Sequence, residues 1–326
     1  MTAATTARGG LTIVGGAGFL GRSLVARLAA APEWAGREVC CLDRVPLPPG
    51  LPRPARLREV VAPVEDAAAL AAAVAGADAV FVRAAVLGGA RSTDVANLRG
   101  YLDGNVALCE RVLGAAAAAG CRRVLFDSSE QVFGDPADAG PQTPAAEPVA
   151  ASYYAATKLI AEQRLRLWAA GPDEPPRSVQ VFRYSRVRAA ETKDVIRAMV
   201  AAALQDRPLR ILGNSTRRIS FVHVDDVVAA NLVALGRAPR FALYHVAADR
   251  PVSLFELALR VREAARQRTG ASPPILVEPA AGARPFEPHV VGLQWEPSLR
   301  ELGLPAPRGL DEMIAETIAA VAGAAP

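Results

Sequence analysis

The chain has 326 residues, of which 51% are hydrophobic and 21% charged, and its formal net charge is +4. This balance is typical of a globular protein that can bury a full core, and the length suits one large domain with a smaller lobe. The basic residues are scattered, and no apolar run is long enough for a membrane span, so we expect neither nucleic acid nor a membrane as a partner.

The first ten residues and the cysteines bear on the cellular compartment, and the cysteines and histidines bear on metal binding. Residues 1–10 are small and polar and lack a basic start followed by an apolar stretch, so no signal peptide is expected. The 4 cysteines (40, 41, 109 and 121) lie in apolar segments, which favours buried, reduced thiols in a cytoplasmic protein. The 3 histidines are far apart and there is no Cys-x-x-Cys pair, so no metal site is expected.

In chain order, the first half of the sequence alternates predicted strands and helices. The strands are expected at 11–16, 38–43, 57–62, 79–84, 123–128 and 178–184, and the helices at 19–31, 66–75, 95–118 and 152–170. A Pro-rich stretch at 45–55 must be a loop. The repetition predicts an α/β fold of Rossmann type, with a doubly wound parallel sheet, in a first domain over 1–177.

The pattern loosens after residue 185. Helices are predicted at 191–206, 225–236, 253–269 and 308–323, and strands at 208–212, 218–224 and 242–248. We expect 178–326 to be a mixed region that returns partly to the sheet and otherwise forms a smaller C-terminal α/β lobe for the substrate.

A glycine-rich turn follows the first predicted strand. Residues 15–21 read GGAGFLG, with Gly15, Gly18 and Gly21 at intervals of three. Glycines let the backbone approach a pyrophosphate, and the helix that follows offers free N–H groups to it. Asp43 closes the second strand, where an acid can bind the hydroxyls of a ribose. Asp43 favours NAD, whereas Arg44 could face the 2′-phosphate of NADP.

A tyrosine and a lysine lie four residues apart in the helix predicted at 152–170. Tyr154 and Lys158 therefore share one face of that helix, while Tyr153 lies on another. A lysine ammonium beside a phenol, with the nicotinamide charge nearby, would lower the pKa of the phenol. The phenol could then exchange a proton with an alcohol while a hydride moves.

The order of five motifs extends the argument. GGAGFLG, Asp43, DSSEQVFGD (127–135), SYYAATKLIAEQ (152–163) and SFVHVDDVV (220–228) together resemble the NAD-dependent epimerase/dehydratase family, the extended short-chain dehydrogenases that act mainly on nucleotide sugars. The resemblance runs from about residue 10 to 315. It implies NAD as cofactor and a nucleotide sugar as substrate.

The resemblance also implies roles for single residues. Ser129, Tyr154 and Lys158 would be catalytic, and Lys158 would also hold the ribose. The turn residues Phe19 and Leu20 would join the three glycines at the pyrophosphate. The remaining cofactor contacts would come from Asp43, Arg44, Val64, Ala84, Ala85 and Asn105. Ser128, Glu130 and Gln131 would face the substrate.

Several positions depart from the family pattern. The usual Gly-Asp after the third strand reads Ala62-Pro63, and the usual His-Leu-Ala-Ala reads Val82-Arg83-Ala84-Ala85. The Asn that meets the sugar diphosphate in the family is Arg186. The Arg-Asp before FVHVDD is Ile219-Ser220, with Arg217 and Arg218 just upstream. Arg186 and Arg218 are the candidates for compensating anion contacts.

Gln131 reduces the number of reactions that the resemblance allows. Dehydratases and decarboxylases of this family carry a Glu there, and an amide cannot act as such a base. This disfavours both reactions, although Glu130 is one step away. We expect an epimerase that oxidises C4 of a sugar to a ketone and reduces it again. The alternatives are reduction of a 4-keto deoxysugar by NAD(P)H, or oxidoreduction of another alcohol.

Two further expectations concern the oligomeric state and the alternative of a protein that binds NAD(P) without catalysing a reaction. Helices 95–118 and 152–170 are expected to pack against their copies in a homodimer, as in similar enzymes. Their small, Ala-rich faces would equally suit burial within one subunit. A regulator that binds NAD(P) without catalysis is the alternative from another class, and the joint presence of Ser129, Tyr154 and Lys158 argues against it.

Overall fold

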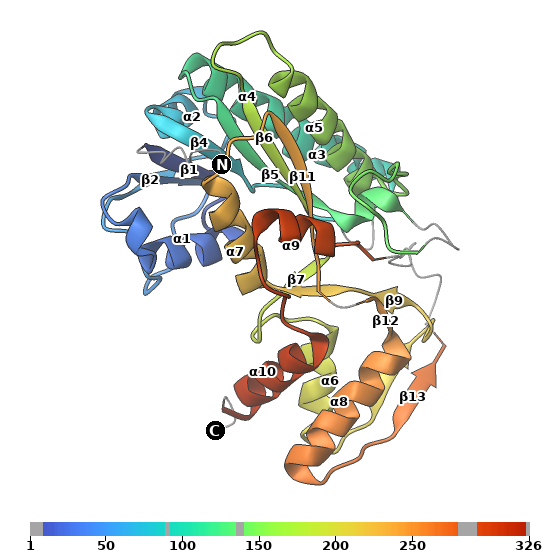
Figure 1. Cartoon of the computed structure of the whole chain (residues 1–326). Helices are drawn as coiled ribbons and strands as arrows, with labels where there is room; N and C mark the ends of the chain where they lie inside the picture. Colours follow the sequence, from blue (N-terminus) through green and yellow to red (C-terminus); the bar gives the residue numbers. More distant parts are fainter. Residues whose placement is uncertain (1–8, 89–91, 135–139, 249, 280–291, 324–326) are drawn as a thin grey trace. The chain divides into compact units, whose positions relative to one another are not determined.

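The computed structural model describes residues 9–88, 92–134, 140–248, 250–279 and 292–323 (Figure 1). The segment 1–8, on which the expectation about a signal peptide rests, lies outside these residues. The chain forms two compact units. The first comprises residues 1–132, 148–183 and 228–244, and the second 133–147, 184–227 and 245–326.

The first unit is built on a seven-stranded sheet. Its strand order is β11-β6-β5-β4-β1-β2-β3, and β1 pairs in parallel with both β2 and β4. The order reverses between β1 and β4, and in such sheets a dinucleotide binds beyond the carboxyl ends of the strands at this point. The strands are β1 (Gly10–Val14), β2 (Val39–Asp43), β3 (Leu57–Val61), β4 (Ala77–Val82), β5 (Arg123–Ser129), β6 (Ser178–Tyr184) and β11 (Phe241–Val246).

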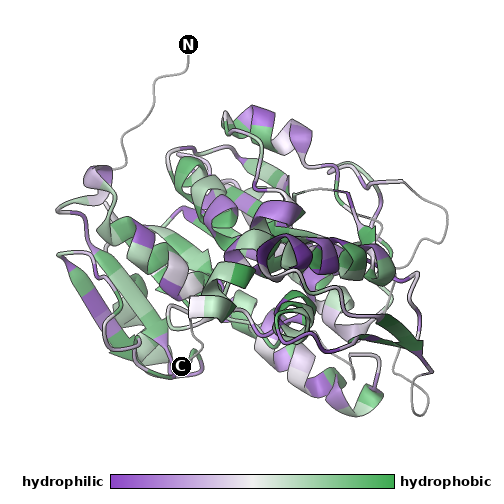
Figure 2. Cartoon of the chain, turned by 90° about the horizontal axis from the view of Figure 1, so that it is seen from below, coloured by the Kyte–Doolittle hydropathy of each residue, from purple (hydrophilic) through white to green (hydrophobic). Residues whose placement is uncertain are grey.

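Helices cover both faces of this sheet. The helices α2 (Ala67–Val74), α4 (Leu108–Ala118) and α5 (Tyr153–Ala169) pack on one face, and α1 (Phe19–Ala29) and α7 (Val224–Leu235) lie on the other (Figure 1). Figure 2 shows that the sheet strands are largely hydrophobic. Central strands of a doubly wound sheet are buried on both sides, which explains why their sequences are apolar runs without alternation.

The helix expected at 95–118 is uninterrupted but changes its helical type along its length. A 3₁₀ turn, η2 (Val95–Asn97), leads into α3 (Leu98–Tyr101), a π-helical segment η3 (Leu102–Ala107) and then α4. A π-helical turn holds one residue more than an α-helical turn, and such segments often occur at functional sites. The long helix expected over 95–118 is thus present, with a π-helical segment that the sequence did not indicate.

The second unit has its own core. The helices α6 (Val195–Ala203), α8 (Leu254–Thr269) and α10 (Leu310–Gly323) enclose buried aliphatic residues. Three small sheets complete the unit: β7 (Arg186–Arg188) with β10 (Phe221–His223), β9 (Arg218–Ile219) with β12 (Val252–Ser253), and β8 (Leu209–Leu212) with β13 (Ile275–Glu278). The strand β13 and the helix α9 (Glu296–Leu302) were not predicted.

The division between the units differs from the boundary expected at residues 177 and 178. The strand β6 and most of β11 belong to the first unit, as do residues 228–235 of α7. These pieces pair with or cover the large sheet, so the chain returns to the first unit after leaving it. The domain boundary and the substrate-binding lobe expected from the sequence stay predictions.

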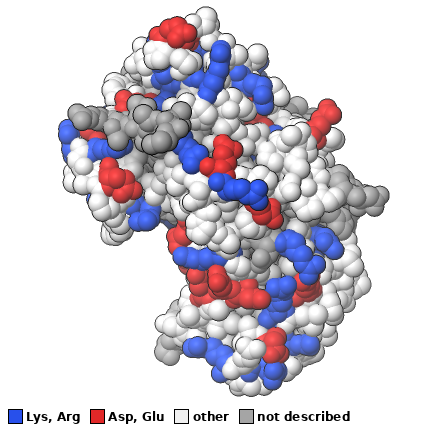
Figure 3. Space-filling model, in the orientation of Figure 1, with Lys and Arg blue, Asp and Glu red and all other residues white. Residues whose placement is uncertain are grey.

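Three remaining expectations concern cysteines, membranes and charge. All four cysteines are buried and unpaired, and burial raises the pKa of Cys41 and of Cys109 to about 12. None of the described helices is long and apolar enough to cross a membrane. Charges of both signs are interspersed on the face shown in Figure 3.

Candidate functional site

The glycine turn joins β1 to α1 and lies against the carboxyl ends of β2 and β4. Gly15 has a φ of +94°, and a Cβ there would lie 2.5 Å from the backbone nitrogen of Ala84. A Cβ on Gly21 would lie 2.2 Å from the Gly15 carbonyl oxygen. Both positions thus require glycine for steric reasons. Gly18 is the N-cap of α1, so the free N–H groups of Phe19, Leu20 and Gly21 lie at the start of this helix.

Asp43 ends β2 directly beside this turn. Its Oδ2 accepts a hydrogen bond of 2.9 Å from the backbone nitrogen of Ala17, and the carboxylate remains partly exposed. Arg44 follows on the surface. A carboxylate fixed next to a phosphate-binding turn fits a ribose hydroxyl pair, so the chain can hold a dinucleotide in the way that such folds do.

The other cofactor residues expected from sequence lie at the ends of β3 and β4. The backbone nitrogens of Arg83 and Ala84 both donate to the Val14 carbonyl at 2.9 Å, which fixes the end of β4 against β1. Ala85 follows and is partly exposed. Val64 is 7% exposed and packs in the core between the sheet and α2, so only its backbone could be available to an adenine.

The helix α5 carries Tyr154 and Lys158. It begins after Ser152, whose side chain accepts a hydrogen bond from the backbone nitrogen of Ala155. Both side chains point into the protein: Tyr154 is 6% exposed and Lys158 is 3% exposed. The Lys158 Nζ donates to the Asp127 carbonyl at 2.8 Å and lies 4.7 Å from the centre of the Phe126 ring. The lysine is thereby anchored to the carboxyl end of β5.

The pKa values of this pair follow mainly from burial. Burial raises the pKa of Tyr154 to about 12, with a hydrogen bond from Ser129 opposing the rise and Asp127 and Tyr101 adding to it. Burial also lowers the pKa of Lys158 to about 8, partly offset by Asp127. A lowered tyrosine pKa was expected, and in the protein alone it is raised, because the loss of water outweighs any effect of the lysine. Ser129 and Tyr154 are nevertheless in direct contact.

Asn105 lies in the π-helical segment and is buried. Its Oδ1 accepts from the Val86 nitrogen at 2.8 Å, while its Nδ2 donates to the Val86 carbonyl at 3.1 Å and to Oγ1 of Thr157 at 3.0 Å. The side chain therefore ties the loop after β4 to the helix α5. It supports the candidate site through these two elements.

The residues next to Ser129 in the sequence have different structural surroundings. Ser128 donates to Glu162 on α5, and Arg183 of β6 forms two hydrogen bonds with the same carboxylate, at 3.0 and 2.6 Å. Ser128 thus takes part in a buried polar network. Glu130 and Gln131 begin the 3₁₀ turn η4 (Glu130–Phe133), and the Gln131 nitrogen donates to Ser129 Oγ at 3.2 Å.

Gly88 is a site residue that the sequence did not indicate. A Cβ at Gly88 would lie 2.7 Å from Cδ1 of Tyr154 and 3.2 Å from Oε1 of Gln131. The loop after β4 therefore passes directly over the tyrosine ring. The two residues before it, Val86 and Leu87, are 39% and 74% exposed. A glycine among apolar residues carries no recognisable signal, so only the fold reveals this contact.

The two arginines proposed for anion binding lie in the second unit. Arg186 is exposed at the start of β7, and its nitrogen donates to the Ser220 carbonyl at 3.2 Å. Arg218 is exposed on β9 and pairs in register with Ser253. Their role in holding a diphosphate stays a prediction.

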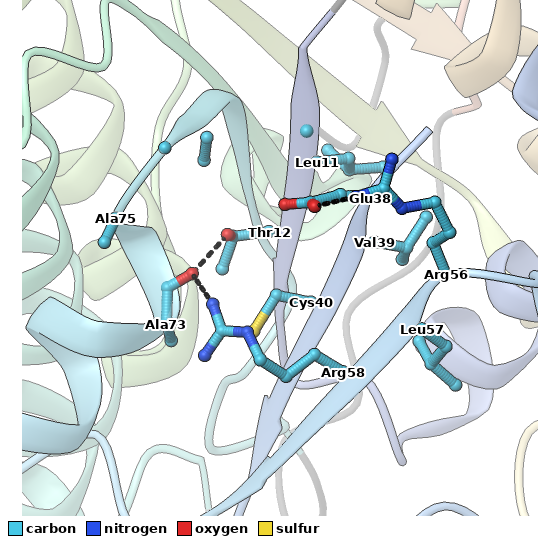
Figure 4. Close-up of a pocket in the computed structure, with 13 residues that line it drawn as sticks. Leu11, Thr12, Glu38, Val39, Cys40, Arg56, Leu57, Arg58, Ala73 and Ala75 are labelled. Atoms are coloured by element: carbon cyan, nitrogen blue, oxygen red, sulfur yellow. Dashed lines mark hydrogen bonds and ion pairs between the residues drawn. The ribbon is translucent and has the colours of Figure 1, made fainter. Parts of the chain in front are cut away.

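A cavity of about 290 Å³ lies elsewhere in the first unit (Figure 4). It is lined by the first residues of β1, β2 and β3, including Thr12 and Cys40, and by the end of α2. Arg58 reaches the Ala72 carbonyl at 2.9 Å across one wall. Since Gly15 and Asp43 follow the opposite ends of the same strands, this cavity is separate from the candidate site. Among the described residues, no group of three potential metal ligands occurs.

The comparisons with known proteins agree with this fold. Residues 11–247 match the model of the NAD dependent epimerase/dehydratase family, and the chain belongs to that family. It is 31% identical, over 81% of this chain and 71% of the relative, to a 3 beta-hydroxysteroid dehydrogenase/Delta 5-->4-isomerase of Mycobacterium tuberculosis (strain CDC 1551 / Oshkosh).

Solved structures of sugar-nucleotide enzymes are also similar. MoeE5 in complex with UDP-glucose and NAD has a TM-score of 0.79 and 29% identity, over 95% of this chain and 98% of that chain. The DesIV dTDP-glucose 4,6-dehydratase from Streptomyces venezuelae, with NAD bound, has a TM-score of 0.79 and 24% identity, over 97% of each chain. The protein is thus an enzyme of the extended short-chain dehydrogenase type.

Proposed function

We propose that this protein is an NAD-dependent 4-epimerase of a nucleotide sugar, which oxidises the C4 alcohol to a ketone and reduces it again from the other face. The observation that carries the proposal is the buried group of Ser129, Tyr154 and Lys158 at the carboxyl end of β5. This end of the sheet is also where the glycine turn and Asp43 lie.

In the proposed reaction, Tyr154 takes the hydroxyl proton of the substrate while a hydride leaves the same carbon. Ser129, which hydrogen bonds with Tyr154, would orient the substrate hydroxyl toward the phenol. Lys158 would hold positive charge near the phenol and bind a ribose hydroxyl. NAD, when bound, supplies the hydride acceptor and donor. The reverse transfer restores the alcohol, and Tyr154 returns the proton.

Two features favour epimerisation over the other sugar reactions of the family. Gln131 stands where a dehydratase needs a carboxylate, and its amide cannot take up a proton at neutral pH. Asp43 faces the turn through Ala17 and would repel a 2′-phosphate, which favours NAD, although exposed Arg44 leaves NADP possible. A single reduction of a 4-keto deoxysugar by NAD(P)H would use the same three residues.

A second candidate is the oxidation of an apolar secondary alcohol, as in the hydroxysteroid dehydrogenase relative. The specific observation in its favour is the loop after β4. Val86 and Leu87 expose apolar side chains next to Gly88, which lies over Tyr154. The family residues that bind a sugar diphosphate are replaced at Arg186 and at Ile219–Ser220, which also suits a substrate without that group.

The first experiment is to denature freshly purified protein and identify the released dinucleotide by mass spectrometry. Nearly stoichiometric NAD supports an internal redox cycle, and the protein should then interconvert UDP- or dTDP-sugars without added cofactor. If the protein is empty and reduces added NAD only with a hydroxysteroid, the epimerase proposal is refuted and the second candidate holds. Tyr154→Phe should lower either activity about 10²- to 10⁴-fold and retain the dinucleotide. Tyr153→Phe is the matched control on the same helix.

A further inference from the structure

Arg83 occupies the position directly after β4 where the resemblance to the family leads us to expect a different residue. Its side chain is 1% exposed. One guanidinium nitrogen, Nη1, donates to the Leu20 carbonyl at 2.8 Å, and Nη2 donates to Oδ1 of Asn231 on α7. The guanidinium carbon lies 3.9 Å from the centre of the Phe81 ring. Arg83 is thus held between the first turn of α1 and the sheet.

The same guanidinium faces a buried carboxylate at the end of β5. Nη2 of Arg83 lies 3.5 Å from Oδ1 of Asp127, whose side chain is 8% exposed. The backbone carbonyl of Asp127 is the acceptor for Lys158 Nζ at 2.8 Å. One residue of β5 therefore connects the guanidinium to the catalytic ammonium. A carboxylate at this depth needs a balancing charge, because burial removes its hydration.

We propose that Arg83 is a positioning residue, which neutralises Asp127 and fixes the end of β5 relative to the glycine turn, so that Lys158 and Tyr154 keep their catalytic charge states. The proposal rests on the proposed function, since Arg83 acts through Lys158 and Tyr154. It applies equally to the epimerase and to the dehydrogenase, because both use the same three residues.

The electrostatics around Lys158 and Tyr154 give the sign of the effect. After burial, the charge of Asp127 is the largest influence on the pKa of Lys158, which it raises. Cys109 of α4 and Glu162 of α5 act on Lys158 in the same direction. Since a cation beside Asp127 opposes its field, the loss of Arg83 should raise the pKa of Lys158.

Tyr154 should respond in the same direction. Asp127 also raises the pKa of Tyr154, while Ser129 of β5 lowers it and Tyr101 of α3 raises it. An unbalanced Asp127 would make the phenolate harder to form, so alcohol oxidation at neutral pH should slow. Because the Arg83 side chain is 1% exposed, we expect substrate binding to change little when it is replaced.

The composition of the chain allows a direct test, because Lys158 and Lys193 are its two lysines. Protein labelled with ¹³C at lysine Cε gives two resonances, and Lys193→Arg assigns them. We expect Arg83→Met to raise the titration midpoint of Lys158 by roughly one pH unit, a tenfold change in proton affinity. Adding Asp127→Asn to Arg83→Met should bring the midpoint back to the wild-type value or below, and Arg83→Lys should restore most of it.

Turnover provides the second measurement. Arg83→Met should lower kcat for alcohol oxidation about tenfold at neutral pH and change KM by no more than about twofold. The pH at which kcat rises should be higher in the variant than in the wild type. If Arg83→Met does not fold, Asp127→Asn alone must lower the Lys158 midpoint. An unchanged Lys158 midpoint in folded Arg83→Met, or in Asp127→Asn, overturns the proposal. The NMR titration needs no substrate, so a shifted midpoint in a protein without either proposed activity would refute the function and keep the role of Arg83.

Discussion

Nδ2 of Asn105 donates a hydrogen bond of 3.0 Å to Oγ1 of Thr157, and this bond joins the π-helical segment to the helix that carries Tyr154 and Lys158. The same amide makes two hydrogen bonds to the backbone of Val86, in the loop that crosses the tyrosine ring. A buried side chain that makes three hydrogen bonds fixes both elements, because movement of the amide would break the bonds to Val86 and to Thr157 together.

Asn105→Ala should therefore destabilise the protein by about 2 kcal/mol, since two partly buried hydrogen bonds to the Val86 backbone and one buried bond to Thr157 are lost. Asn105→Asp should be worse, because a carboxylate oxygen would face the Val86 carbonyl. Urea unfolding measures both effects. Asp103→Asn, at an exposed position of the same segment, is the matched control and should change stability by less than about 0.5 kcal/mol. Equal stabilities for Asn105→Ala and the control would contradict this role.

The glycine turn makes a steric prediction. Gly21→Ala should reduce NAD affinity by at least about tenfold and destabilise the fold, because its Cβ would lie 2.2 Å from the Gly15 carbonyl oxygen. Gly114→Ala in α4 meets nothing within 4 Å and should leave stability unchanged or increase it by up to about 1 kcal/mol. Calorimetric titration with NAD and thermal unfolding test the pair. Normal NAD binding by Gly21→Ala would show that the turn is looser than the structure indicates.

Lys158 predicts a pH dependence of stability. Its pKa falls from 10.5 in an exposed lysine to about 8 in the folded protein, so between these values the unfolded chain binds the proton more readily. The contribution of Lys158 to stability should therefore rise with pH between about pH 8 and 10.5, and be lost as the pH falls through that range. The Tm of wild type minus that of Lys158→Met should increase over this interval.

The matched control is Lys193→Met, which removes an exposed lysine in place of a buried one. Its Tm difference from wild type gives the baseline for the Lys158 measurement. A flat difference between wild type and Lys158→Met across the same pH range would mean that Lys158 is not desolvated as the structure shows.

The buried hydrogen-bond network of Ser128, Glu162 and Arg183 predicts an effect on the free energy of unfolding. Glu162→Gln removes the charge that pairs with Arg183, both side chains being less than about 10% exposed, and should cost about 3 kcal/mol. Glu110→Gln breaks an exposed ion pair with Arg164 and should cost less than about 1 kcal/mol. Chemical unfolding compares the two. If both variants lose equally little, the buried pair does not stabilise the fold.

The sequence predicted most of the first unit because its signals are local. Apolar runs, a glycine turn and the Tyr154–Lys158 spacing each depend on a few neighbouring residues, and the strands and helices lie within a few residues of the expected ranges. The family resemblance pointed to Ser129 and Asp43, which lie at the carboxyl ends of their strands, and their roles stay predictions. NAD as the family's cofactor is likewise confirmed by the family match.

The parts that were missed depend on contacts between distant segments. The strand β13 follows a Pro-rich stretch and is stabilised by pairing with β8, about 65 residues earlier in the chain. The π-helical segment carries Asn105, whose hydrogen-bond partners Val86 and Thr157 are distant in the sequence. The direction of Ser128 follows from Glu162 and Arg183. The expected homodimer through helices 95–118 and 152–170 stays a prediction.

The π-helical segment allows two parts of one helix to face different partners. An inserted residue in a helix turns everything beyond it by about 100°. Upstream of the turn, Tyr101 contacts the ring of Tyr154; downstream, Cys109 and Val112 face the sheet. Deleting a single residue from Leu102–Ala107 would rotate one of these faces away from its partner. The extra residue thus sets the angle between two faces of one helix, one at the candidate site and the other in the hydrophobic core.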